Sequence, residues 1–217
     1  MLDHHRSSIN DPVGDYNYID PGAAAAGVLM YELLGLMEAI PDKYIGQCLY
    51  AAIATDTGRF QYSNTNKECW DIIGEISTWG CDFLKASTEI YESKREEQVR
   101  ITAYALNKME VSEDGKWAIT VLSKEELDSM GVRAGETDEI VGEMRSVKGV
   151  EVSVFLREVE HNVIRVSYRS KYSADVSGLA SLHGGGGHKR AAGATLYMSL
   201  AEAGETLRKD LRNYFSN

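Results

Sequence analysis

The stretch RSKYSADVSGLASLHGGGGHKRAAG, residues 169–193, decides the fold of this chain. Four consecutive glycines, Gly184, Gly185, Gly186 and Gly187, stand between two histidines, and lysine and arginine follow the second histidine, His188. A run of glycines costs much backbone entropy on ordering, so a folded protein retains it where backbone N–H groups must approach a ligand closely. Successive exposed N–H groups form a nest for anions, which predicts an anion-binding loop. A flexible linker is the alternative, but the flanking His, Lys and Arg disfavour it.

The residues around this loop predict a sheet with helices. Apolar and polar residues alternate over 150–156 and over 164–168, which indicates two strands joined by a turn at 160–162. Asp175 is placed to cap a short helix over 176–182. Further strands are predicted over 117–123 and 193–199, and further helices over 124–131, 137–146 and 200–215. Mixed strands and helices make this part of the chain α/β or α+β.

Two arginines lie on the polar face of the strand that precedes the loop. Arg169 comes just before the helix that leads to the glycines, and arginine suits bidentate recognition of phosphate. We therefore expect Arg169 to contact a ligand. Arg165, four residues earlier, is interpreted as a solvated charge at the edge of the sheet.

The first half of the chain predicts helices. Asp20-Pro21 resembles an N-cap followed by proline at the first helical position, which predicts a helix from 22 to Pro41. The apolar run over 46–55 is ambiguous, and we favour a helix that runs into a short strand or turn at 54–58. Further helices are predicted over 67–79 and, as one or two helices, over 83–109. We divide the chain into residues 1–93, a linker helix over 94–107, and a second domain over 108–217.

The charge of the chain is unevenly distributed. The net charge is −10, with 23 Lys and Arg against 33 Asp and Glu, which argues against tight binding of long nucleic acid. Residues 1–160 carry a net charge of −14 and residues 161–217 one of +4. An acidic first part suits divalent metals, and a basic last part suits a small anionic ligand. Solvated charges would produce the same asymmetry. No membrane span or secretory signal is recognised, and the cysteines indicate reduced thiols, so we expect a cytoplasmic protein.

Two further groups of residues suggest metal chemistry. Asp3, His4 and His5 stand at the start of the chain, and imidazole with carboxylate is a usual ligand set for Mn, Fe or Zn. A tag remnant or a loose terminus is the alternative. Asp56 follows an apolar run and precedes Thr57-Gly58, as at the ligand-binding edge of an α/β sheet. An ordinary turn or helix cap is the alternative for Asp56.

Asp3-His4-His5, the segment ATDTGRFQYSNT over 54–65, and the stretch 169–193 occur in the order that is typical of one family. Together they resemble the DHH/DHHA1 phosphoesterases, and within them the oligoribonuclease and phosphoadenosine-phosphate phosphatase branch. The resemblance covers residue 3 to about residue 200. It implies the C-terminal part of a parallel-sheet DHH domain of the α/β class, followed by a smaller mixed α/β DHHA1 domain, with two metal ions, usually Mn²⁺.

The resemblance also implies roles for particular residues. His4 and Asp56 resemble metal ligands. His5 resembles the residue that contacts the scissile phosphate and assists proton transfer, with Asp3 as the acid that orients it. Arg169, the glycines 184–187 and His188 resemble the contacts to the substrate's terminal phosphate and nucleotide. Arg59 lies in the matching motif, as do Asn64 and Thr65, with less defined roles.

The chain departs from the family pattern at its beginning. The family has two earlier motifs that contain aspartates, and its DHH residues end a buried strand, whereas only Met1 and Leu2 precede them here. We interpret the chain as the C-terminal two thirds of such an enzyme, from a shortened gene, a misplaced start codon or a deliberately shortened chain. Two-metal chemistry requires more ligands than His4 and Asp56 supply. A first domain without its early strands would expose apolar surface and an unpaired edge, which is compatible with aggregation or with a homodimer.

The resemblance implies a Mn²⁺-dependent phosphohydrolase that degrades very short RNA oligonucleotides and also acts on adenosine 3′,5′-bisphosphate. Linear or cyclic dinucleotides are an alternative substrate class. A nucleotide-phosphate-binding fragment without catalysis is the alternative from a different functional class. Long nucleic acid and membranes are not expected partners.

Overall fold

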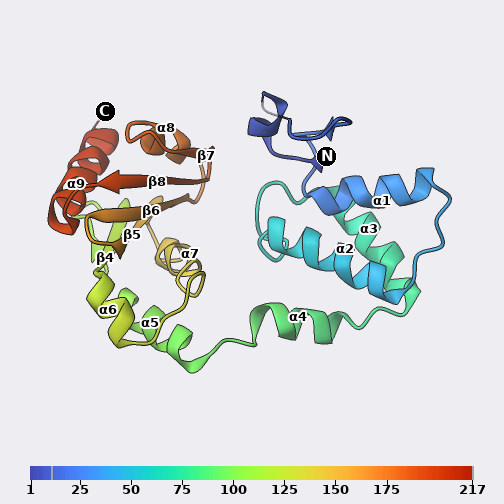
Figure 1. Cartoon of the computed structure of the whole chain (residues 1–217), viewed down its shortest axis with the longest axis horizontal. Coiled ribbons are helices and arrows are strands. Elements are labelled where there is room, and N and C mark those ends of the chain that lie inside the picture. Colours follow the sequence, from blue (N-terminus) through green and yellow to red (C-terminus); the bar gives the residue numbers. More distant parts are fainter. Residues whose placement is uncertain (11, 217) are drawn as a thin grey trace. The chain divides into compact units, whose positions relative to one another are not determined.

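We describe residues 1–10 and 12–216 in a computed structural model. The chain divides into two compact units, residues Met1–Ser93 and Lys94–Asn217 (Figure 1). Each unit has its own hydrophobic core, so each is described by itself.

The first unit consists of helices beside a short pair of parallel strands. Apolar side chains from α1, α2 and α3 and from the turn before α1 form its core, which includes Val28, Leu49, Ile53 and the thiol of Cys69. Strand β1 pairs with β2 so that Asp3 lies opposite Ile19. The elements are β1 (Leu2–Asp3), η1 (Arg6–Ile9), β2 (Tyr18–Ile19), α1 (Ala26–Leu36), α2 (Lys43–Asp56), α3 (Lys67–Ile76), η2 (Ser77–Trp79) and α4 (Phe83–Tyr91).

Helix α1 begins and ends inside the predicted range. The prediction that Asp20-Pro21 caps it is wrong, because Asp20 Oδ1 accepts a hydrogen bond from Gly22 N at 2.7 Å and closes a turn before the helix. The helix ends at Leu36, and Glu38, two residues later, adopts a left-handed conformation with φ of 52°. Ala39 N donates to Leu34 O at 3.0 Å, which is the capping bond of a Schellman motif.

Helix α2 contains Asp56, which the sequence analysis placed in a short strand or turn. Asp42, directly after Pro41, caps its N-terminus by accepting from Tyr44 N and Ile45 N, both at 3.0 Å. The helix then continues through Asp56. The favoured helix is therefore confirmed, whereas the strand at 54–58 does not form, and Asp56 ends a helix instead of a strand.

The second unit contains a six-stranded mixed sheet with the order β3-β4-β5-β6-β8-β7. Strands β4 and β5 are parallel, and the other neighbouring pairs are antiparallel. The predicted strands and helices of this part are all present, and β3 and β7 are additions. The elements are α5 (Glu96–Asn107), β3 (Glu110–Val111), β4 (Trp117–Leu122), α6 (Lys124–Ser129), α7 (Ile140–Arg145), β5 (Val152–Glu160), β6 (Val163–Ser170), α8 (Val176–Ser181), β7 (Gly186–His188), β8 (Ala191–Tyr197) and α9 (Leu200–Ser216).

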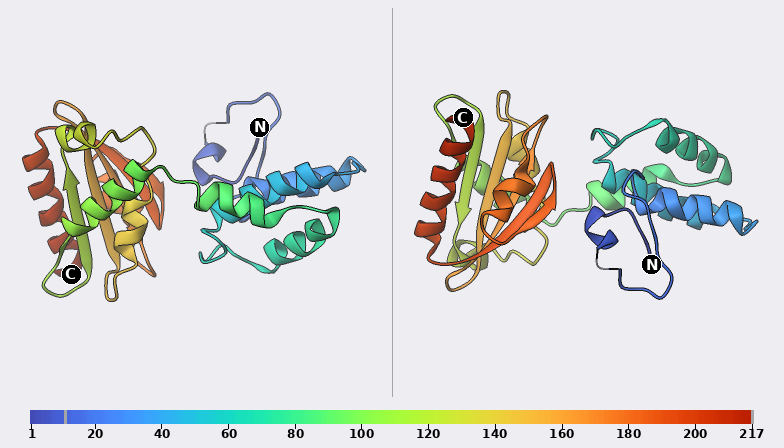
Figure 2. Two further views of the ribbon diagram at one scale, coloured as in Figure 1. Left: turned by 90° about the horizontal axis from the view of Figure 1, so that it is seen from below. Right: turned by 90° about the horizontal axis from the view of Figure 1, so that it is seen from above.

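Helices cover one face of this sheet fully and the other face only in part. Ala203, Leu207 and Leu211 of α9 pack on one face together with residues of α8, as Figure 2 shows for α9. On the opposite face, Ile101 and Ala105 of α5 and residues of α7 pack against Ala118, Leu122 and Phe155. That second core uses β4 and β5. The corresponding face of β6, β8 and β7 carries polar residues and glycines, and we call it the polar face.

The four glycines are partly a strand, and their closest contacts are to the protein itself. Gly184, with φ of 69°, ends α8, because Gly185 N donates to Ala180 O at 3.0 Å. Gly186 and Gly187 then begin β7, which pairs with β8. A Cβ atom at Gly185 would lie 2.2 Å from Gly193 O, and one at Gly187 would lie 2.5 Å from Ala191 O. The prediction of a loop over 184–187 is therefore wrong for Gly186 and Gly187, which lie in β7. Glycine is required at 185 and 187 because the backbone approaches β8 closely there.

The carboxylate of Glu126 makes the second unit sensitive to acid. Glu126 reaches back to Ser123 N in a capping box and accepts from Tyr104 Oη and Lys108 Nζ. Partial burial opposes ionisation of Glu126, but these hydrogen bonds outweigh it and lower its pKa to about 2 from 4.5. Because the folded pKa is depressed, the stabilisation is present above pH 4.5 and is lost as the pH falls toward 2.

We expect the free energy of unfolding to fall by about 2 kcal/mol more between pH 5 and 2.5 in the wild type than in Glu126→Gln. Urea unfolding at a series of pH values measures this difference. Glu125→Gln, at the exposed neighbouring position, is the control and should follow the wild type. Equal acid sensitivity of Glu126→Gln and the wild type would contradict the prediction.

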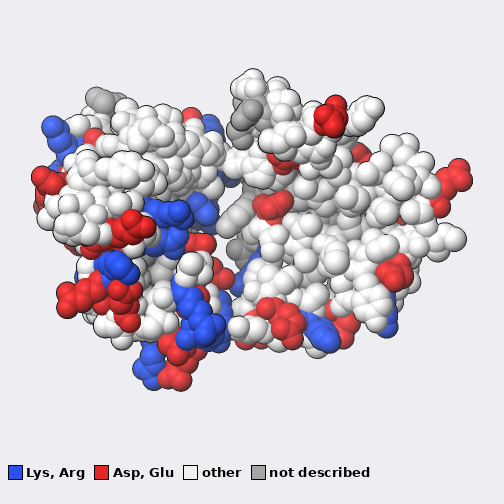
Figure 3. Space-filling view, viewed as in Figure 1, with Lys and Arg blue, Asp and Glu red and all other residues white. Residues whose placement is uncertain are grey.

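The two units differ in charge. The first contains 5 Lys and Arg against 14 Asp and Glu, and the second contains 18 against 19. Figure 3 shows blue and red side chains mixed on the second unit, whereas the visible face of the first is mostly uncharged, with scattered red and a few blue side chains. No helix among residues 1–10 and 12–216 combines the length and apolar character that a membrane span requires.

Candidate active site and phosphate-binding face

The predicted acid and histidines gather at the end of β1. The ligand atoms of Asp3, His4 and His5 all lie within 4.8 Å of one another. The ring centroids of the two histidines are 4.5 Å apart. The parallel pairing of β1 with β2 fixes this position, since Tyr18 N donates to Met1 O and Asp20 N donates to Asp3 O. Adjacent residues at the end of a strand can therefore serve one site here.

Asp3 orients His5. Its Oδ1 lies 2.7 Å from His5 Nδ1 and also accepts from His4 N at 2.7 Å and from His5 N at 3.2 Å. Its Oδ2 accepts from Ser8 Oγ. The bonds from Ser8 and from His5 hold the pKa of Asp3 well below its usual range. An ionised carboxylate beside His5 Nδ1 favours the tautomer with the proton on Nδ1 and a lone pair on Nε2.

His4 and Asp56 face each other. His4 Nδ1 lies 3.3 Å from Ala23 O, so a carbonyl acceptor favours the proton on Nδ1 and a lone pair on Nε2. That Nε2 atom lies 3.3 Å from Asp56 Oδ2. The His4 side chain is 13% exposed and that of Asp56 is 39% exposed. Two acceptor atoms that face each other in this way repel unless a proton or a cation lies between them.

Asn64 holds this pair in place. Its Nδ2 donates to Ala24 O at 2.9 Å and to Asp56 O at 3.1 Å. Asn64 therefore links the end of α2 to the turn at Ala23 and Ala24. The carbonyl of Ala23 in this turn faces His4. Sequence reasoning assigned no role to Ala23 or Ser8. A serine five residues after the acid gave a weak signal for Ser8, and a backbone carbonyl leaves no signal in a sequence.

Arg59 lies in a strained turn that directly follows Asp56 in the chain. Gly58, Arg59 and Phe60 all have positive φ, of 56°, 59° and 63°. Successive left-handed residues that are not glycine are costly and are frequent at functional sites. The Arg59 guanidinium lies over the Tyr91 ring at 4.0 Å. Its predicted contact to substrate stays a prediction.

The polar face of the second unit brings the other predicted residues together. Arg169 on β6 and His188 on β7 are both directly opposite Ala191 on the strand between them, so the three form one row across the sheet. Gly186 and Gly193 lie opposite each other two residues further along, in the next row on this face, where Ser167 joins them. Arg169 Nη1 also donates to Tyr168 O at 3.0 Å. Arg169, His188 and the glycines at 184–187 therefore share one region, and their contact to a substrate stays a prediction.

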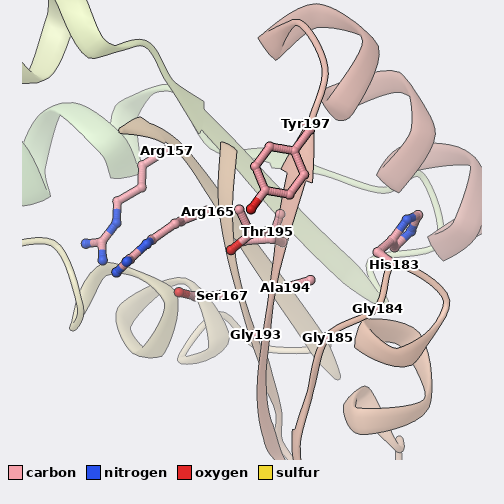
Figure 4. A pocket seen from close by; sticks show the side chains of 11 residues that line it. Arg157, Arg165, Ser167, His183, Gly184, Gly185, Gly193, Ala194, Thr195 and Tyr197 are labelled. Carbon is pink, nitrogen blue, oxygen red and sulfur yellow. The ribbon is translucent and has the colours of Figure 1, made fainter. Parts of the chain in front are cut away.

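The same face continues into a pocket of about 660 Å³ (Figure 4). Arg165 is exposed, as its interpretation as a solvated charge requires, but it does not lie at the sheet edge, because β6 is an interior strand, and it lines this pocket. Arg157 lies opposite Arg165 on β5, and the two guanidinium groups point to the same side. The other lining residues are Val166, Ser167, His183, Gly184, Gly185, Gly193, Ala194, Thr195 and Tyr197.

Comparison with known proteins shows what the chain is similar to. Residues 114–217 match the family described as the DHHA1 domain. The chain is 31% identical over 201 residues to the bifunctional oligoribonuclease and PAP phosphatase NrnA of Bacillus subtilis, which covers 90% of this chain. It is 30% identical over 212 residues to the probable enzyme of the same name in Streptococcus mutans, which covers 98%. Residues 114–217 form a DHHA1 domain, and the chain is similar to DHH/DHHA1 phosphoesterases over most of its length. The resemblance in the sequence is thereby confirmed.

A solved structure also supports the fold of this chain. An exopolyphosphatase-related protein from Bacteroides fragilis has a TM-score of 0.89 and 30% identity, with 99% of this chain covered. The predicted α/β class with a DHHA1 domain is thus confirmed. The chain spans 62% and 66% of the length of the Bacillus and Streptococcus relatives and 63% of the Bacteroides chain. The activity of a whole enzyme is therefore a matter for proposal.

Proposed function

We propose that this chain serves a metal-dependent phosphoesterase that degrades very short RNA oligonucleotides and dephosphorylates adenosine 3′,5′-bisphosphate. The observation that carries the proposal is the pair of acceptors formed by His4 Nε2 and Asp56 Oδ2, 3.3 Å apart and beside the oriented His5. The names of the two curated relatives, which are oligoribonucleases and PAP phosphatases, supply the substrate class.

The donor set at this pair fits a metal ion. An imidazole nitrogen and a carboxylate oxygen suit Mn²⁺. Metal–ligand distances are about 2.1 Å for nitrogen and oxygen donors, so two donors 3.3 Å apart can bind the same ion. The Ala23 carbonyl provides the outer contact that metal-binding histidines usually have. When bound, such an ion supplies Lewis-acid chemistry to a phosphoryl group.

The chain's own residues perform the remaining tasks in this proposal. His5, oriented through Nδ1 by Asp3, holds or moves a proton at Nε2 next to the scissile phosphate. Asp3 is a positioning residue, because both of its oxygens already accept hydrogen bonds. Arg169 and His188, which occupy one row of the polar face, bind the substrate's terminal phosphate.

Binding of Mn²⁺ tests the metal part of the proposal without requiring turnover. We expect Asp56→Asn to weaken Mn²⁺ binding by about 10- to 100-fold, because it removes a charged oxygen ligand. Loss of the free Mn²⁺ signal in electron paramagnetic resonance measures the affinity. Asp71→Asn on α3, an exposed carboxylate paired with Lys67, is the matched control. Equal affinities of the two variants would remove the metal assignment.

Hydrolysis of a 5′-phosphorylated RNA dinucleotide with Mn²⁺ tests the activity. We expect turnover of the dinucleotide and of adenosine 3′,5′-bisphosphate, and little turnover of a long RNA. If the chain binds mononucleotides but hydrolyses none of the three, it is a nucleotide-phosphate-binding module without catalysis. That outcome would overturn the proposal.

A further inference from the structure

The pocket at Arg157 and Arg165 has a charge arrangement that packing does not explain. The two arginines are directly opposite on neighbouring antiparallel strands, and like charges opposite each other destabilise a sheet. Arg157 is 16% exposed and is held by Asp138 Oδ1 at 2.9 Å and by Thr137 Oγ1. Among the residues that the structure describes, no carboxylate pairs with Arg165. An anion between the two guanidinium groups would relieve this repulsion.

The other groups of the pocket suit a nucleotide. Hydroxyl groups of Ser167 and Thr195 lie on the same side as the arginines in Figure 4. Tyr197 stands at the rim with 79% of its surface exposed, and exposed aromatic rings stack nucleobases. Two arginines, two hydroxyls and one exposed ring therefore provide contacts for a phosphate, a sugar and a base.

The pocket lies on the same face as the predicted terminal-phosphate site. Arg165 and Arg169 are four residues apart on β6 and point to one side, so their rows are about 13 Å apart along the strand. The row between them contains Ser167 and the facing glycines Gly193 and Gly186. These glycines carry no side chains, so a ligand can lie flat across this row.

We propose that Arg157 and Arg165 bind a second phosphate of a short oligonucleotide whose terminal phosphate binds at Arg169 and His188. This inference rests on the proposed function. A mononucleotide with one phosphate can occupy only one of the two positions, whereas a trinucleotide can reach both. The pocket would thus provide affinity for chains of a few nucleotides.

Binding measured without divalent metal tests the second phosphate position, because hydrolysis is then absent. The ligands are a 5′-phosphorylated RNA trinucleotide and AMP, and calorimetry with the full chain gives the affinities. We expect Arg165→Gln to weaken trinucleotide binding by about 10-fold and to change AMP binding by less than about 2-fold. Arg169→Gln should weaken binding of both the trinucleotide and AMP. Tyr197→Leu should weaken the trinucleotide by about 5-fold or more, through lost stacking.

Arg212→Gln, on an exposed position of α9, is the matched control. If Arg165→Gln binds the trinucleotide as tightly as Arg212→Gln, or loses AMP and trinucleotide equally, the proposal is wrong. Titration of the wild type with inorganic pyrophosphate, monitored through the Arg165 Nε resonance, tests anion binding in the pocket independently of enzymatic activity. A shift of this resonance without trinucleotide binding would support an anion pocket and overturn the oligonucleotide assignment. The absence of a shift would overturn both the anion pocket and the oligonucleotide assignment. Failure of the dinucleotide assay alone would overturn only the proposed function.

Discussion

His5→Ala is expected to lower kcat for the RNA dinucleotide by about 10³-fold in the proposed phosphoesterase, with little change in KM. General acid–base groups contribute about 10²- to 10⁴-fold. His5 is half exposed, and Asp3 Oδ1 fixes its ring from 2.7 Å. Because the proposal places His5 next to the reacting phosphate and not at the terminal-phosphate contacts, its loss should affect the chemical step. Steady-state kinetics with Mn²⁺ measures both parameters.

Asp3→Asn separates orientation from chemistry. The amide of asparagine can still accept from His5 but no longer favours one tautomer through its charge, so we expect a smaller loss of kcat than for His5→Ala. The ¹⁵N chemical shifts of the His5 ring should report more of the other tautomer. His161→Ala, at the exposed turn between β5 and β6, is the control. Unchanged kcat in His5→Ala would exclude the proton-transfer role.

The second unit could be predicted well because apolar and polar residues alternate clearly along the strands of its sheet. Residues of β6 alternate between the α8 and α9 side, with Ile164, Val166 and Tyr168 buried, and the polar face, with Arg165 and Arg169. The pocket could not be predicted, because it depends on register. Only the pairing of Arg157 with Arg165 brings two arginines together that are eight residues apart in the chain.

The first unit was harder because short polar side chains compete for several roles. Asp20 and Asp42 each precede or follow a proline, and the sequence alone favoured the wrong one as a cap. The alanine-rich run before Asp56 is compatible with a strand or a helix, and the cap at Asp42 decides for a helix. The cluster of Asp3, His4 and His5 was nevertheless recognised, since its residue types carry the chemistry whatever element presents them.

Gly185→Ala is expected to reduce the free energy of unfolding of the second unit by about 3 kcal/mol. The added Cβ would lie 2.2 Å from Gly193 O, 2.7 Å from Ala194 Cβ and 2.8 Å from Ala194 Cα. Two of these atoms belong to the backbone of β8, which is held between β6 and β7. Relief therefore requires separation of β7 from β8, since no flexible side chain can move aside. Urea unfolding gives the difference.

Gly186→Ala is the control within the same run of glycines. Nothing lies within 4 Å of the Cβ position at Gly186, so we expect a change of less than about 0.5 kcal/mol in stability. If Gly186→Ala folds normally but binds the RNA trinucleotide more weakly, the glycine at this position serves close approach of a ligand. Equal stability of Gly185→Ala and the wild type would contradict the packing argument. If instead Gly185→Ala is destabilised and Gly186→Ala is not, as expected, the four glycines have separate uses: Gly184 ends α8, Gly185 and Gly187 approach β8, and Gly186 leaves the polar face open.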